Sequence, residues 1–169
     1  LSNTYSQEAV SSIIEVTTNF LEILKKSKFN GKFIYTSSSM VYGEFNNQIV
    51  TEESATKPIS IYGSAKLAGE IITKGFCESF GLKYSIIRPS AVYGPTDVNR
   101  RVVQIFMENA FKGKQIVVNG PKSKIDFTYV EDLVQGYEKV INSNRSENQI
   151  FNITRGNART LIDLAKIIQ

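Results

Sequence analysis

A tyrosine and a lysine stand four residues apart in the segment ISIYGSAKLAGE, residues 59–70. The segment is typical of the start of a helix, where positions i and i+4 lie on one face, so Tyr62 and Lys66 can point into the same site. A tyrosine with its ordinary pKa of about 10 is a poor base at neutral pH, but a neighbouring ammonium lowers that pKa. With a serine hydroxyl to hold the substrate oxygen, the pair could move a proton to or from an alcohol or a ketone.

The composition limits which other groups could do this chemistry. The 169 residues contain no histidine and a single cysteine, Cys77. Histidine triads, Cys-His pairs and histidine or thiolate-cluster metal sites cannot be built from these residues, so we expect no metal. Proton transfer must rely on Tyr, Lys, Asp or Glu. The lone cysteine fits a reducing compartment, which indicates the cytoplasm.

The charge pattern bears on partners. The chain has a formal net charge of +4 and a pI near 9.1. A nucleic-acid surface would need a denser basic stripe with exposed aromatic side chains, and no apolar stretch has the length of a membrane span. We therefore expect neither a nucleic acid nor a membrane as partner. A mildly basic site suits an anionic small molecule.

Helical and extended patterns alternate along the chain. The apolar spacing predicts helices over 7–28, 60–80, 100–113, 131–143 and 160–169, and strands over 32–38, 83–88, 114–118 and 149–154, with a short extended piece at 126–130. This alternation favours an α/β fold with a mostly parallel sheet and helices on both faces. Ligands of such sheets bind beyond the carboxyl ends of the strands, so the two strand ends at 37–39 and 88–90 and the helix of Tyr62 could converge on one crevice.

By itself the Y-x-x-x-K spacing is weak, because a lysine lying along a half-buried tyrosine on any helix would also produce it. The order of motifs carries more information. TSSSMVYGE, YGSAK, IIRPSAVYGP, DFTYVEDLVQGY, FNIT and LIDLAKII follow one another. This ordered set resembles the extended short-chain dehydrogenase/reductase family, in particular its NAD-dependent epimerase/dehydratase group, which acts on nucleotide-diphosphate sugars. The resemblance covers nearly all of the chain.

The resemblance implies a Rossmann-like fold of which this chain is the middle portion. Residues 1–95 would be the C-terminal part of the dinucleotide-binding domain, and residues 96–169 a mixed segment with part of the substrate lobe and returning strand and helix elements. The Gly-rich G-x-x-G-x-x-G turn of the family, which binds the pyrophosphate, is absent from the 169 residues. The chain as given would therefore be an incomplete, inactive fragment, and the choice between NAD and NADP stays open.

The resemblance also assigns roles to particular residues. Tyr62 would be the general acid/base, and Lys66 would tune its pKa and bind the nicotinamide ribose. Ser38, five residues before the glycine of VYG, would be the catalytic hydroxyl. Pro89 and Ser90 would lie nearest the nicotinamide. The cofactor would be NAD or NADP.

The chain departs from the family pattern at the substrate. Dehydratases place Asp and Glu directly after the catalytic hydroxyl residue, whereas this chain has Ser39 and Met40, which disfavours a 4,6-dehydratase. We favour a structural role for Ser37 and Ser39, as strand-end residues that cap backbone groups. The candidate substrate-binding residues are Ser39, Arg100, Arg101 and Lys124.

We expect a nucleotide-sugar epimerase that transiently oxidises a sugar hydroxyl. An NADPH-dependent reductase of a 4-keto nucleotide sugar would share every residue named here. A non-catalytic dinucleotide-binding sensor would have no need of Ser38, Tyr62 and Lys66. The family often dimerises through a four-helix bundle, which implies a homodimer through the helices at 7–28 and 60–80.

Overall fold

The structure is a computed structural model that describes residues 6–45, 49–97 and 99–169. The chain divides into two compact units, the first formed by Leu1–Pro89 and Tyr137–Ile153, the second by Ser90–Gly136 and Thr154–Gln169. The helices are α1 Ser6–Lys26, α2 Ile61–Phe80, α3 Val102–Phe111, α4 Val130–Asn142 and α5 Leu161–Ile168, with 3-10 turns η1 Ser39–Tyr42 and η2 Asn144–Ser146. The strands are β1 Lys32–Thr36, β2 Lys83–Pro89, β3 Val92–Tyr93, β4 Lys124–Ile125, β5 Thr128–Tyr129, β6 Gln149–Ile153 and β7 Arg159–Thr160. Within the described ranges, no helix combines the length and the apolar character needed to cross a membrane.

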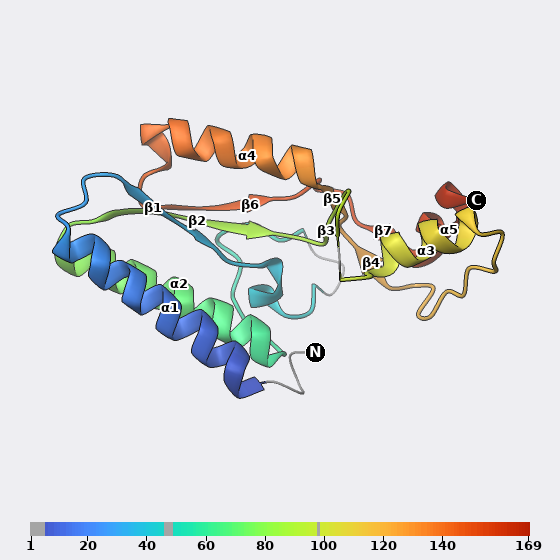
Figure 1. The fold of residues 1–169 in the computed structure, drawn as a ribbon, viewed down its shortest axis with the longest axis horizontal. Coiled ribbons are helices and arrows are strands. Elements are labelled where there is room, and N and C mark those ends of the chain that lie inside the picture. The colour runs from blue at the N-terminus through green and yellow to red at the C-terminus, as the bar shows by residue number, and fades with distance from the viewer. Residues whose placement is uncertain (1–5, 46–48, 98) are drawn as a thin grey trace. The chain divides into compact units, whose positions relative to one another are not determined.

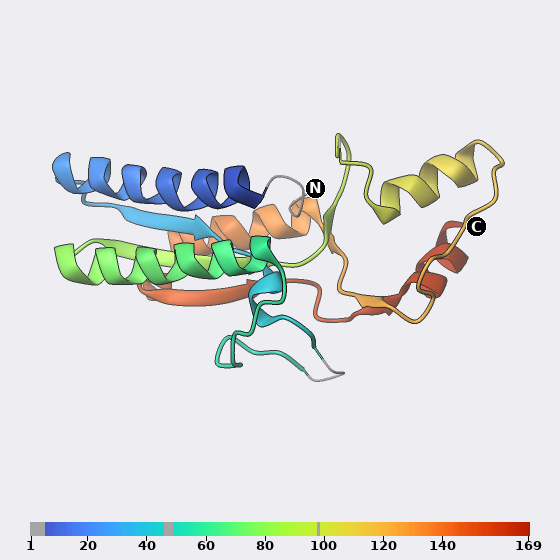
Figure 2. The ribbon, with the colours of Figure 1, turned by 90° about the horizontal axis from the view of Figure 1, so that it is seen from below.

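The first unit contains a parallel sheet of three strands in the order β1-β2-β6. Ile86 at the centre of β2 pairs with Tyr35 of β1 and with Ile150 of β6. Helices α1 and α2 lie side by side on one face of this sheet, and the turns of α4 from Tyr137 onward lie on the other (Figure 1 and Figure 2). The prediction of a mostly parallel sheet with helices on both faces is confirmed.

The core of the first unit lies between the two long helices and the sheet. Leu21 of α1 and Cys77 of α2 are fully buried against β1 and β2, where they meet Tyr35, Tyr84 and Ile86. Both faces of β2 are covered, so every residue from Tyr84 to Arg88 is buried rather than every second one. Burial of these side chains provides the main driving force for the unit.

The second unit combines short strand pairs with α3, α5 and the first turns of α4. β3 pairs with β5 in parallel, and β4 pairs with β7 antiparallel. Helices α3 and α5 contact each other over a core of Val103, Phe106, Phe127, Leu161, Leu164 and Ala165. A capping box begins α5, since the side chains of Thr160 and Asp163 each bond the backbone N–H of the other residue.

The strand predicted over residues 114–118 is wrong. These residues are all described and form no ladder; the chain leaves α3 through Gly113, whose φ is +61°, and continues irregularly. Ile116 and Val118 pack against the core of the second unit and Val117 between them is exposed, so this apolar run reflects packing rather than strand pairing. The strand predicted over 32–38 ends earlier, at Thr36, because Ser38 already caps η1.

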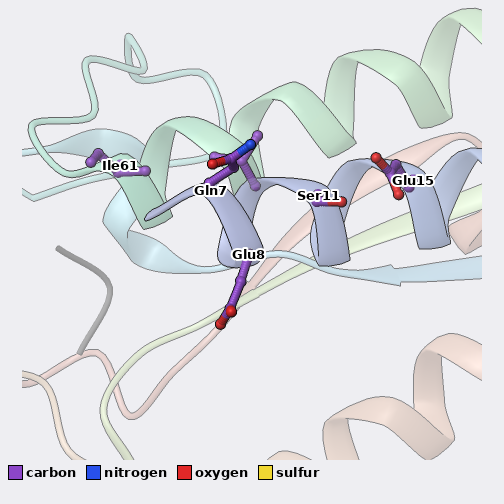
Figure 3. A pocket seen from close by; sticks show the side chains of 6 residues that line it. Gln7, Glu8, Ser11, Glu15 and Ile61 are labelled. Carbon is purple, nitrogen blue, oxygen red and sulfur yellow. The ribbon is translucent and has the colours of Figure 1, made fainter. Parts of the chain in front are cut away.

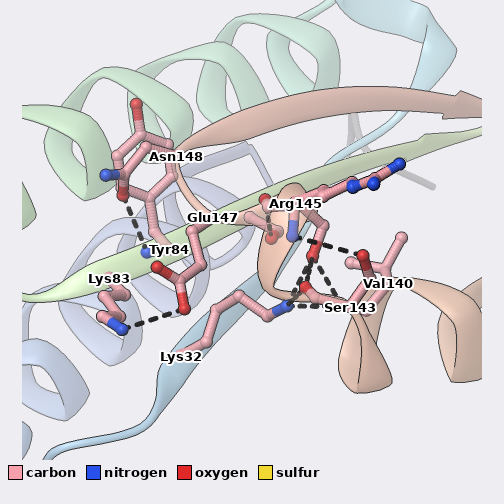
Figure 4. A network of polar contacts seen from close by, with 10 residues as sticks. Lys32, Lys83, Tyr84, Val140, Ser143, Arg145, Glu147 and Asn148 are labelled. Atoms are coloured by element: carbon pink, nitrogen blue, oxygen red, sulfur yellow. Dashed lines mark hydrogen bonds and ion pairs between the residues drawn. The ribbon is translucent and has the colours of Figure 1, made fainter.

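A half-buried lysine connects α4 to the sheet. The ammonium of Lys32, the first residue of β1, donates to the carbonyl oxygens of Val140 and Ser143, at 2.5 and 2.8 Å, and to Oγ of Ser146 (Figure 4). These carbonyls belong to the C-terminal end of α4, where helical carbonyls have no partner within the helix and the helix dipole favours a cation. Lys32 therefore caps α4 from the neighbouring strand.

We predict that Lys32→Met lowers the free energy of unfolding by about 1–3 kcal/mol, because the carbonyls it satisfies lose a charged donor. Lys83→Met is the matched control. Lys83 pairs with Lys32 across the two strands, but its own ammonium is half exposed and forms an ion pair with Glu147 at 2.9 Å, which is worth about 0–1 kcal/mol. Urea unfolding measures both. Equal midpoints for the two variants would contradict the capping role.

Candidate active site

Tyr62 and Lys66 occupy the first two turns of α2. The helix begins at Ser60, whose Oγ accepts a hydrogen bond from the backbone N–H of Gly63 at 3.0 Å. Nζ of Lys66 lies 5.8 Å from the ring centroid of Tyr62 and donates to the carbonyl oxygen of Thr36 at 2.9 Å. The two side chains therefore share one face of α2, and the ammonium sits at the carboxyl end of β1.

A second phenol, Tyr35, also lies close to Lys66 but is unsuited to proton transfer. Nζ of Lys66 is 5.5 Å from its ring, and its hydroxyl donates to the Lys66 carbonyl at 3.3 Å. Burial, followed by the charge of Glu70, raises the pKa of Tyr35 to about 12. Desolvation lowers the pKa of Lys66 itself. Of the two tyrosines beside the ammonium, Tyr62 is thus the better candidate for the acid/base.

The three consecutive serines after β1 have different environments. Ser37 is 2% exposed, and its hydroxyl donates to the carboxylate of Glu70. The prediction that Ser37 caps a backbone group is therefore wrong. Ser38 is the residue that caps, since its Oγ accepts from the N–H of Met40 at 3.2 Å at the start of η1. A hydroxyl that accepts this bond still carries its own proton for donation. Ser39 is the first residue of η1.

Two glycines allow α2 to approach the segments that carry these hydroxyls. A Cβ on Gly63 would lie 2.6 Å from the carbonyl oxygen of Met40, and one on Gly69 would lie 2.0 Å from the hydroxyl of Tyr35. Both distances are too short for an L side chain without movement of the neighbour. The first turn of α2 therefore lies against η1 only because position 63 has no side chain.

The sequence analysis did not predict the buried polar residues that lie behind this site in the first unit. Glu70, one turn after Lys66, is 2% exposed and forms a two-point ion pair with Arg88 of β2, which is 3% exposed. Tyr42 of η1 contacts the same guanidinium. Two features of the sequence could have indicated this pair. Glu70 continues the four-residue spacing of Tyr62 and Lys66, and Arg88 stands within a segment predicted to be a buried strand.

The remaining candidates are distributed between the units. Pro89 is the last residue of β2 in the first unit, whereas Ser90 belongs to the second. The guanidinium of Arg100 lies 3.3 Å from Glu108, and that of Arg101 donates to the Val92 carbonyl and lies 3.9 Å from Asp97. Lys124 is exposed on β4. The second unit thus already supplies a carboxylate to each arginine, and substrate contact by these residues stays a prediction.

Two surface hollows are not lined by the predicted catalytic residues. The larger, of about 680 Å³, is lined by Gln7, Glu8, Val10, Ser11, Glu15 and Ile61, from α1 and the start of α2 (Figure 3). The smaller, of about 470 Å³, shares Val10 and Ile61 with it and is mostly apolar. Neither is lined by Ser38, Tyr62 or Lys66, so neither is the candidate active site.

Comparison with known proteins identifies the family. Residues 1–154 match the model of the NAD-dependent epimerase/dehydratase family. The chain belongs to this family. It is 35% identical over 136 residues to UDP-glucuronate 4-epimerase 1 of Arabidopsis thaliana, a match that covers 77% of this chain and 32% of that protein.

Solved structures of the family share the fold. The UDP-glucose 4-epimerase of Thermotoga maritima, with UDP-glucose, superposes with a TM-score of 0.88 at 30% identity, covering 99% of this chain and 55% of that one. The UDP-glucuronic acid 4-epimerase of Bacillus cereus, in complex with UDP-glucuronic acid and NAD, gives 0.86 at 28% identity, covering 94% and 51%. The expected Rossmann-like fold is confirmed. The chain spans about a quarter to a half of the length of the curated relatives it matches.

We predict that Gly63→Ala destabilises the protein by about 1–3 kcal/mol, because its Cβ must push the Met40 carbonyl away from α2. Gly75→Ala is the control on the same helix. A Cβ there meets nothing within 4 Å, so the alanine should stabilise the helix by about 0.5–1 kcal/mol. Urea unfolding of both variants measures these changes in stability. A stabilised Gly63→Ala variant would contradict the prediction, because it would show that η1 can move away from α2 without loss of stability.

Proposed function

We propose that the full-length protein containing this chain is an NAD(P)-dependent nucleotide-sugar epimerase with Tyr62 as its general acid/base. The observation that carries the proposal is the placement of the Lys66 ammonium beside the Tyr62 ring and on the Thr36 carbonyl, at the carboxyl end of a parallel strand. That edge is where ligands bind in sheets of this kind. The names of the relatives, UDP-sugar 4-epimerases among them, support the substrate class.

The groups at this edge fit a dinucleotide. An ammonium has three hydrogens, and the bond to Thr36 uses one, so Lys66 can also donate to the hydroxyls of a ribose. Pro89 ends β2, the strand next to β1, and is part of the same edge. The dinucleotide, when bound, would accept a hydride from a sugar carbon and later return it.

Ser38 and Tyr62 would bind the sugar hydroxyl and transfer its proton. The hydroxyl of Ser38 would hold the reacting sugar oxygen, and Tyr62 would take its proton as the carbon is oxidised. The nearby ammonium favours the phenolate that accepts this proton. After the keto sugar has rotated in the site, Tyr62 would return the proton to the sugar oxygen. The configuration of the oxidised carbon would then be inverted.

We predict that Tyr62→Phe lowers the turnover of a nucleotide sugar by about 10²–10⁴-fold in the full-length protein and leaves dinucleotide affinity nearly unchanged. Tyr35→Phe is the control, because it removes a phenol equally close to Lys66 whose pKa is too high for the task. It should retain most of the turnover. The same assay should find Ser38→Ala severely impaired and Ser39→Ala much less so. Turnover by Tyr62→Phe at the wild-type rate would end the proposal.

We also propose that the protein is a homodimer whose interface is formed by α1 and α2. The outer face of α1 exposes Val16, Phe20 and Ile23 at helical spacing, each at least half exposed, and α2 exposes Ile71 at 63%. Large exposed apolar patches are rare on the free surface of a monomer and mark interaction sites.

We predict that Ile23→Glu converts the full-length protein from dimer to monomer, because it places a charge in this interface. Val134→Glu is the control: Val134 is 50% exposed, but it lies on α4. Sedimentation velocity at micromolar concentration distinguishes the two. A wild-type protein that sediments as a monomer would contradict the proposed interface.

A further inference from the structure

The ion pair between Glu70 and Arg88 lies in the interior of the first unit. Nε of Arg88 is 2.9 Å from Oε1 of Glu70, and Nη2 is 2.6 Å from Oε2. Both side chains are almost fully buried, at 2–3% exposure. Burying two charges costs several kcal/mol per ion, and the attraction between them repays this only with good geometry and further hydrogen bonds. A buried pair is thus weak evidence for a contribution to stability.

Further hydrogen bonds connect the pair to other segments of the first unit. The hydroxyl of Ser37, just after β1, donates to Oε1 of Glu70. Nη1 of Arg88 donates to the hydroxyl of Tyr42 in η1 at 2.7 Å, and this hydroxyl donates to Oδ1 of Asn152 in β6 at 2.8 Å. The pair therefore joins α2 and β2 to the end of β1, to η1 and to β6.

The same segments carry the residues of the candidate active site. Glu70 lies one turn after Lys66 and two turns after Tyr62 on one face of α2, so fixing Glu70 fixes the rotation of the helix that aims both side chains. Ser37 precedes Ser38, and Tyr42 is the last residue of the 3-10 turn that Ser38 caps. The ion pair thus holds the Ser38 segment at both ends.

We propose that Glu70 and Arg88 are positioning residues for the acid/base site, which keep Tyr62 and Lys66 in register with Ser38. This proposal rests on the proposed function of Tyr62, Lys66 and Ser38. Proton transfer depends on geometry, and a misplacement of about 1 Å can cost on the order of 10²-fold in rate. A pair that served stability alone could be replaced without effect on the rate of the folded protein.

The first test compares two buried serines in the full-length protein. Ser37→Ala removes one hydroxyl from the ion pair. Ser85→Ala removes an equally buried hydroxyl from β2, one that donates to the Ser146 carbonyl at 2.6 Å instead of to the pair. We expect similar losses of stability, but only Ser37→Ala should lower kcat, by about five- to twentyfold, with KM nearly unchanged. Equal kcat values in the two variants would overturn the proposal.

The second test removes both charges at once. Replacing a buried ion pair by apolar side chains of similar volume is often neutral for stability, whereas removing one partner is strongly destabilising. Glu70→Leu combined with Arg88→Met should therefore fold, and its kcat should fall by about 10–100-fold with KM nearly unchanged. A folded double variant that keeps the wild-type kcat would overturn the proposal.

A third measurement does not depend on activity. Hydrogen exchange of the backbone amides at residues 39–43 and 63–67 should be faster in Ser37→Ala than in Ser85→Ala, because only the first variant loosens η1 and the start of α2. Equal exchange would overturn the positioning role. A wild-type protein that turns over no nucleotide sugar would instead overturn the proposed function, and this exchange comparison would still decide whether the pair holds the segments.

Discussion

A charged pair in a protein interior must have nearly every hydrogen-bonding group satisfied, and this requirement organises the carboxyl end of the sheet. Burial alone would lower the pKa of the Arg88 guanidinium, but the hydrogen bonds that it donates to Glu70 and Tyr42 outweigh that effect and raise the pKa. The guanidinium therefore stays charged whenever the protein is folded. Its five donors have fixed directions, so the partners on α2 and η1 have little freedom to shift.

The backbone around the pair is correspondingly close-packed. Gly63 and Gly69 let α2 approach η1 and β1 to distances that a Cβ would prevent. Polar side chains then find partners that are far away in the sequence. The division of labour among the serines follows from this packing: Ser37 points to the buried carboxylate, and Ser38 turns to cap the backbone of η1.

Much of the site was predictable because the arrangement of its two central residues depends only on their spacing along one helix. The spacing of Tyr62 and Lys66 on a helix requires that they share a face, and the N-cap at Ser60 places them in the first two turns. The family motifs pointed to Ser38. Glu70 was missed although it continues the same spacing, since a glutamate on a helix is ordinarily a surface residue. Its burial follows from its contact with Arg88, which comes from a different element.

The sequence by itself determined the parts whose physics is local: the helices, the buried apolar strands of the parallel sheet and the capping box at Thr160. Only the tertiary structure decided the parts that need a distant partner. A strand requires a neighbour to satisfy its backbone groups, and residues 114–118 end in an apolar run but pair with no strand among the described residues. Lys32 reads as one of a run of surface lysines, yet its ammonium meets carbonyls more than a hundred residues away in the sequence. Such contacts depend on how the elements pack, which no short pattern of residues encodes.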